Sequence, residues 1–194
     1  MNLLGNKVYL RNIEKEDVEI LKILVNDKEV STNVVGWSRP ISAMEHEMWF
    51  ANLKNDNSFR YIISCVEDKN KAYGTAIISR IDWKNRNCSI DIKLLKDFQG
   101  SGYGSETIQL LKDYIFNELN MNRISINILE YNKASIKLFE KMGFVLEGVQ
   151  RKAIYKKGKY NNLYLYAILK EDYINEWSRK WILASRIKWD KKNE

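Results

Sequence analysis

The order of hydrophobic and polar positions predicts a strand and two helices in the first part of the chain. Apolar residues alternate over 8–13, which predicts a strand, and recur at helical spacing over 14–25. The segment over 26–41 is expected to be irregular, and after it Ser42 and Glu45 form a capping box. This box predicts the start of a second helix, which we expect to end near residue 55.

The rest of the chain reads as strands interrupted by two helices. We expect the helices over residues 104–119 and 134–142, the second closed by Gly143. The predicted strands are rich in β-branched and aromatic residues and are Phe59–Val66, Ala72–Asp82, Cys88–Leu95, Arg123–Leu129 and two final strands, beginning at Phe144, that flank a turn at Lys156–Lys159. The three strands before residue 96 form an antiparallel meander, because only short turns separate them.

Length and charge indicate one domain with a basic appendage. At 194 residues the chain suits a single domain, which we place at residues 7–172. The tail over 173–194 mixes three tryptophans with six basic residues and predicts an amphipathic helix. Lysine and arginine number 32 against 25 acidic residues, a net charge of +7 that favours anionic partners.

Several classes of protein are disfavoured by what the sequence contains. Cys65 and Cys88 lie apart in predicted strands, which disfavours a disulfide framework. With His46 as the one histidine, the chain also has few residues for a clustered zinc site or a histidine-centred triad. No apolar stretch reaches the roughly 20 residues that span a bilayer. We therefore expect a cytoplasmic protein without a membrane span or a metal.

A glycine-rich loop joins a predicted strand to a predicted helix at Gln99-Gly-Ser-Gly-Tyr-Gly104. Unpaired N–H groups and the positive end of a helix dipole meet at such a point, so the loop suits a phosphate. No lysine followed by serine or threonine comes after Gly104, as a nucleoside-triphosphatase loop requires. The glycine spacing also differs from that of the dinucleotide fingerprint.

The Gln-x-x-Gly-x-Gly pattern over 99–104 resembles motif A of the GNAT superfamily of acetyl-CoA-dependent N-acetyltransferases. Residues 132–144, Asn-Lys-Ala-Ser-Ile-Lys-Leu-Phe-Glu-Lys-Met-Gly-Phe, are similar to its motif B. Three later segments resemble the branch that acetylates ribosomal-protein N-termini and spermidine. They are Phe-Val-Leu-Glu-Gly over 144–148, Gly-Lys-Tyr over 158–160 and Tyr-Ala-Ile-Leu over 166–169. The resemblance implies an α/β fold with a mixed, mostly antiparallel, seven-stranded sheet and flanking helices, splayed between strands 4 and 5 with acetyl-CoA in the gap.

The resemblance also implies which residues hold acetyl-CoA, the acyl-donor co-substrate. Leu94 at the end of the bent strand is expected to offer backbone hydrogen bonds to the pantetheine arm, and Asn132 to bind the same arm. Lys137 is expected to face the nucleotide end. The pyrophosphate is expected on the loop residues Gln99, Gly100, Ser101, Gly102, Tyr103, Gly104 and Ser105, although a tyrosine at position 103 is more often a packing residue.

The sequence departs from the family at the residues that usually move protons. Phe139 stands where many members carry a tyrosine acid, and Ser89 where many carry a glutamate base. Asp91 lies two residues on, on the same face of the strand, where it could relay a proton through water or simply pair with Lys93 or Arg86. Ser135 could serve as the acid or cap its own helix. Asp91 and Ser135 are the catalytic candidates.

These departures favour an acceptor amine of low pKa. At pH 7, deprotonating a lysine-like or polyamine nitrogen of pKa ~10.4 costs about 4.6 kcal/mol, against about 1 kcal/mol for an α-amine near ~7.8. We therefore expect direct transfer, in a ternary complex, to a protein N-terminus or an amino sugar. A polyamine is the alternative, if a pocket is locally acidic; the candidates for such a pocket are Glu14, Glu16, Asp17, Glu45 and Glu47.

The basic tail keeps a second class of function open. Its tryptophans and basic side chains would suit stacking on a nucleic acid, and a non-catalytic module that senses acetyl-CoA or docks on RNA is the alternative to an enzyme. More often such a helix packs on its own domain or on a second subunit of a homodimer.

Overall fold

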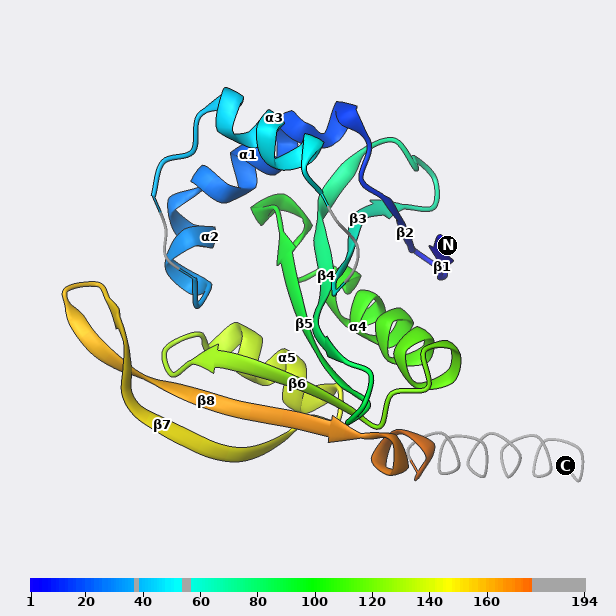
Figure 1. The fold of residues 1–194 in the computed structure, drawn as a ribbon, viewed down its shortest axis with the longest axis vertical. Coiled ribbons are helices and arrows are strands. Elements are labelled where there is room, and N and C mark those ends of the chain that lie inside the picture. The colour runs from blue at the N-terminus through cyan, green and yellow to red at the C-terminus, as the bar shows by residue number, and fades with distance from the viewer. Residues whose placement is uncertain (37–38, 54–56, 176–194) are drawn as a thin grey trace, which may run out of the picture.

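The computed structural model describes residues 1–36, 39–53 and 57–175, and within them one mixed sheet runs through the molecule (Figure 1). The strand order is β1-β2-β3-β4-β5-β6-β8-β7. The strands are β1 (Leu3–Leu4), β2 (Val8–Asn12), β3 (Phe59–Cys65), β4 (Ala72–Asp82), β5 (Asn87–Leu94), β6 (Arg123–Leu129), β7 (Val145–Lys156) and β8 (Lys159–Leu169). The expected seven-stranded sheet gains an eighth strand because the two residues of β1 pair with Leu10 and Tyr9 of β2.

The sheet opens between β5 and β6, which confirms the splay expected between the fourth and fifth predicted strands. These two strands are parallel, and they pair only at Asn87↔Arg123, Cys88↔Ile124 and Ser89↔Ser125. Beyond Ser89 and Ser125 they diverge, as Figure 1 shows. The remaining neighbours in the sheet pair antiparallel, so β5 and β6 form the sides of a V.

The helices lie in two groups. The core joins α4 (Tyr103–Asp113) and α5 (Lys133–Lys141) to one face of the sheet, through residues such as Ile108, Ile124 and Phe139. Residues 114–118 continue α4 as a wider π-helical turn. Leu21 and Leu24 of α1 (Val18–Asn26) are buried outside that core, where α1 contacts β4 and α3 (Ala43–Ala51).

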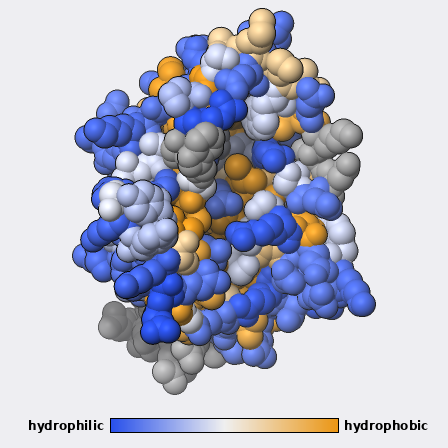
Figure 2. Space-filling view, turned by 60° about the vertical axis from the view of Figure 1, so that its left-hand side comes forward, coloured by the Kyte–Doolittle hydropathy of each residue, from blue (hydrophilic) through white to orange (hydrophobic). Residues whose placement is uncertain are grey.

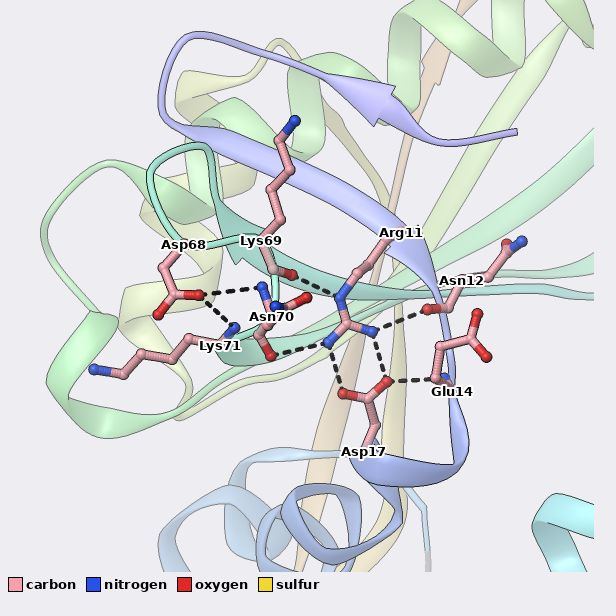
Figure 3. Close-up of polar contacts among 8 residues, drawn as sticks. All are labelled: Arg11, Asn12, Glu14, Asp17, Asp68, Lys69, Asn70 and Lys71. Carbon is pink, nitrogen blue, oxygen red and sulfur yellow. Dashed lines mark hydrogen bonds and ion pairs between the residues drawn. The ribbon is translucent and has the colours of Figure 1, made fainter.

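One arginine joins β2 to the β3–β4 turn and to the start of α1 (Figure 3). The guanidinium of Arg11 on β2 donates to both carboxylate oxygens of Asp17, at 2.6 and 2.7 Å. It also donates to the Lys69 carbonyl in the β3–β4 turn, at 2.8 Å. Asp17 is buried and accepts a further bond from the Glu14 N–H. The hydrogen bond with Asp17 is the main cause of the raised pKa of Arg11.

Local signals in the chain predict some boundaries of the elements correctly. Ser42 and Glu45 form the expected capping box, each side chain accepting from the other residue's N–H. Lys157 and Gly158 adopt φ of 54° and 74°, the two-residue turn that joins β7 to β8. The helix that begins at Ala43 ends at Ala51, earlier than expected. Residues 170–175 are helical, and the rest of the predicted basic tail lies outside the described residues.

The segment between Asn26 and Ile41 is where the expectation of an irregular chain was wrong. It contains a short helix, α2 (Lys28–Asn33). Asp27 caps it, its carboxylate accepting from the Val30 N–H at 2.7 Å. Six residues are too few to show a helical period, and valine, serine, threonine and asparagine are poor helix formers.

Candidate active site

The loop between β5 and α4 makes a sharp turn just before the first residue of α4. Gly100 and Gly102 have φ of 76° and 92°, a conformation that glycine adopts without strain. A Cβ at either position would meet nothing within 4 Å, so these glycines serve the backbone conformation. Gly104 is buried, and a Cβ there would lie 3.3 Å from Cδ2 of Leu138. The third glycine therefore lets α4 pack closely against α5.

Side chains hold this loop in one position. The Gln99 amide donates to the Leu94 carbonyl at 3.0 Å, which ties the loop to the end of β5. Phe98 stacks on Tyr73 of β4 with ring centroids 3.7 Å apart, and Tyr103 meets Tyr73 edge-on at 5.2 Å. Tyr103 is thus a packing residue of the loop. The Tyr73 hydroxyl donates to Sγ of Cys65, which, with burial, raises the pKa of Tyr73 to about 12.

The V and the loop together fit acetyl-CoA. The first turn of α4 presents N–H groups that have no partner within the helix, as a diphosphate requires. Along the V, the backbone of β5 beyond Ser89 is not paired with β6, so it can bond the amides of a pantetheine arm. Leu94 and Leu138 are half-buried beside it and offer an apolar wall. When bound there, acetyl-CoA supplies the activated acetyl group.

The N-terminus of α5 brings together two of the residues expected at the site. Asn132 caps the helix, its carbonyl oxygen accepting from the Ser135 N–H at 3.1 Å. Ser135 therefore does not cap the helix itself, and its side chain is half-buried. Lys137 is exposed on the next turn. Phe139 is buried and packs edge-on against Phe144, with ring centroids 5.1 Å apart.

Hydroxyl groups occupy the point where β5 and β6 diverge. Oγ of Ser89 lies 3.0 Å from Oγ of Ser125, and the Ser125 hydroxyl lies 3.2 Å from the Cys88 carbonyl. Asp91 is exposed on the same face of β5 and accepts a long bond, 3.5 Å, from Ser79. Within the described ranges, Asp91 forms no ion pair with Lys93 or Arg86.

The buried thiol nearest this point is not set up as a nucleophile. Cys88 is fully buried, and burial raises its pKa to about 12. A thiol with so high a pKa stays protonated near neutral pH and does not accept an acyl group. The site therefore suits direct transfer from donor to acceptor.

Helix α2, which the sequence did not reveal, lies across the open end of the V. Glu29 in its first turn pairs with Lys96, just after β5, at 3.3 Å. Its last carbonyls accept three bonds from the other side: the Tyr131 hydroxyl to Thr32 at 2.6 Å, the Asn132 amide to Asn33 at 3.2 Å, and Nζ of Lys156 to Ser31 at 2.6 Å. No spacing in the sequence linked Tyr131 or Lys156 to this segment.

Figure 2 turns the left-hand side of Figure 1 towards the viewer and shows the open side of the molecule. A recess lies near the centre of this face, with hydrophobic residues inside it and hydrophilic residues around it. Among the described residues, no three histidine, cysteine or acidic side chains gather as metal ligands. In the same part of the chain, no helix is long and apolar enough to cross a membrane.

Comparisons with known proteins agree with this geometry. The Acetyltransferase (GNAT) domain matches residues 7–145. The uncharacterized N-acetyltransferase YokL of Bacillus subtilis is 29% identical over 169 residues, which cover 87% of this chain and 93% of that protein. Spermidine N(1)-acetyltransferase of Escherichia coli is 24% identical over 174 residues, which cover 89% of this chain and 91% of that protein.

A solved structure shows the same fold. The crystal structure of spermidine N-acetyltransferase from Vibrio cholerae, in complex with CoA and spermine, superposes with a TM-score of 0.80 at 22% identity. The match covers 88% of this chain and 99% of that one. With the splayed sheet, the loop before α4 and the matched domain, the chain belongs to the GNAT family and is an N-acetyltransferase that uses acetyl-CoA.

Proposed function

We propose that the acceptor is a primary amine of low pKa, such as a protein N-terminus or an amino sugar, acetylated directly in a ternary complex. The observation that carries this is the lack of strong proton-transfer groups at two family positions. Phe139 is buried against Phe144, and Ser89 is bonded to Ser125. The exposed Asp91 is the remaining carboxylate on this face of β5.

The cost of deprotonating the acceptor amine decides which acceptors such a site can use. An α-amine costs about 1 kcal/mol to neutralise at pH 7, whereas a polyamine nitrogen costs about 4.6 kcal/mol. A thioester is already activated, so a neutral amine mainly needs alignment. An enzyme with a weak base can therefore turn over an α-amine much more readily than a polyamine.

Two residues take proposed roles in this reaction. Asp91 receives the proton of the attacking amine through water, because it is exposed and its bond from Ser79 is long. Ser135 donates a hydrogen bond to the departing thiolate from the first turn of α5. Coenzyme contacts are proposed for Leu94, Asn132, Lys137 and residues 99–105.

A polyamine acceptor is the second candidate, and the relatives favour it. The E. coli relative is named for spermidine, and the V. cholerae structure holds spermine. Against it stands the fact that two of the five acidic residues that could form a polyamine pocket are paired with arginines. Asp17 is buried against Arg11, and Glu45 pairs with Arg39 at 2.7 Å and caps α3.

A matched acceptor panel tests the proposal. Purified protein is given acetyl-CoA with an N-terminal peptide, glucosamine or spermidine, and thiol release and product mass are followed. We expect kcat/KM for the peptide or the amino sugar to exceed that for spermidine, and Asp91→Asn to lower it. A clear preference for spermidine would refute the low-pKa acceptor and support the second candidate.

A further inference from the structure

A groove of about 390 Å³ lies between the end of α2 and the tip of the β7–β8 hairpin. Ser31 and Thr32 form one wall, and residues 153–157 form the other. These are the same residues of α2 whose carbonyls accept from Lys156 and Tyr131. The groove therefore adjoins the open end of the V on the β6 side.

The hairpin wall of the groove is cationic. Between residues 148 and 169 the chain has no acidic residue, and its basic residues are Arg151, Lys152, Lys156, Lys157 and Lys159. Lys156 and Lys157 line the groove. Lys156 uses one N–H on the Ser31 carbonyl, which leaves its ammonium group two further donors. Nζ of Lys157 lies over the Tyr131 ring, 4.4 Å from its centroid.

The acidic residues on the neighbouring elements are already engaged. Glu29 on α2 pairs with Lys96, on the side away from the hairpin. Glu130, after β6, accepts from the Asn162 N–H at 3.0 Å. Glu147, at the far end of β7, pairs with Arg123, and this hydrogen-bonded pair lowers the pKa of Glu147. Within the described part of the chain, neither Lys156 nor Lys157 forms an ion pair with a carboxylate.

We propose that this groove binds a carboxylate of the acceptor, so that the enzyme prefers peptides whose N-terminal amine is followed by acidic side chains. This rests on the proposed function and narrows it. An ammonium donor bound to a carboxylate is among the stronger hydrogen bonds. A polyamine in the same groove would place like charges together, which is unfavourable. Helix α2 and the hairpin hold the two walls in place through Lys156.

The test compares two peptides that differ only in glutamate or glutamine at positions 2–4. We expect kcat/KM at low salt to be roughly tenfold higher for the glutamate peptide. Lys157→Glu removes or reverses this preference without changing the dissociation constant for coenzyme. Lys84→Glu makes the same change in net charge in the β4–β5 turn, at the closed end of the V, and leaves the preference intact. Equal rates for the two peptides in wild type would overturn the inference.

A binding measurement keeps the two proposals separate. The same two peptides, N-acetylated and labelled at the C-terminus, are titrated with protein and followed by fluorescence anisotropy. If neither free peptide is acetylated but the acidic product binds and loses affinity in Lys157→Glu, the groove stands and the peptide acceptor fails. If both peptides are acetylated and bind alike, the acceptor class stands and the groove assignment fails. Circular dichroism confirms that each variant is folded.

Discussion

Single residues decide what chemistry this site can perform. Glycine at 100 and 102 shapes the loop through backbone conformation, whereas Gly104 is needed for helix packing. Three glycines that look equivalent in the sequence therefore serve two purposes. Phe139 and Ser89, read from the sequence as departures from the family, are both buried; Phe139 packs against Phe144, and the Ser89 hydroxyl is hydrogen-bonded to that of Ser125.

Gly102→Ala is expected to weaken coenzyme binding. A side chain at φ of 92° costs about 1–2 kcal/mol, so the loop shifts towards a conformation that no longer presents the α4 N–H groups. We expect the dissociation constant for coenzyme, measured by calorimetry, to rise about tenfold. Gly148→Ala is the matched control, because the new Cβ would lie 3.8 Å from Leu165 at an ordinary φ. Unchanged binding in Gly102→Ala would mean that the loop does not hold the coenzyme.

The sequence could predict the loop, because glycine spacing reflects backbone conformation locally. It could not predict the partners of Asp91 or Asn132. The Asn132 amide reaches Asn33, which is 99 positions away, and only the fold brings the two together. Asp91 was equally compatible with an ion pair and with solvent until the register of β4 and β5 was known.

At the scale of elements, the most informative part is α2. The helix is short and intrinsically weak, and three side chains from two other segments hold it through its last carbonyls. Its existence thus depends on tertiary contacts, which explains why its sequence reads as irregular. The longer elements, with clear periods of two or 3.6, are found where the pattern predicts them.

Tyr131→Phe is expected to loosen α2 without unfolding the protein. It removes the 2.6 Å bond to the Thr32 carbonyl, worth about 1 kcal/mol. Amide hydrogen exchange at residues 30–34 should accelerate, and KM for the acceptor should rise, while exchange in the sheet stays the same. Tyr160→Phe removes a hydroxyl from an exposed ring on the β7–β8 hairpin and provides the control. If exchange in α2 is unaffected by Tyr131→Phe, the hydroxyl does not hold the helix.

At the scale of the whole molecule, two features give the fold its shape. The splay of the sheet follows from three parallel pairs between β5 and β6, and the Arg11–Asp17 pair joins β2, the β3–β4 turn and the start of α1. The family resemblance predicted the splay. The pairing of Arg11 with Asp17 was not foreseen, since Asp17 read as one of several acidic residues open to a ligand.

Asp17→Asn is expected to destabilise the protein by about 3 kcal/mol, because it leaves the Arg11 charge partly buried without its partner. Chemical denaturation measures the free energy of unfolding. Glu19→Gln breaks an exposed pair with Lys22 on the same helix and should cost less than about 0.5 kcal/mol. If both variants lost a similar amount of unfolding free energy, the buried Arg11–Asp17 pair would matter no more to stability than the exposed Lys22–Glu19 pair.

The central claim is that the enzyme aligns a neutral amine and supplies no strong base. The dependence of kcat/KM on pH, measured for two acceptors of different amine pKa, tests it most directly. With an α-amine we expect the rate to level off near pH ~7.8, and with a lysine-like amine only near pH ~10.4, since each curve follows the acceptor's own ionisation. One inflection at the same pH for both acceptors would show that a base on the enzyme sets the rate, and would contradict the claim.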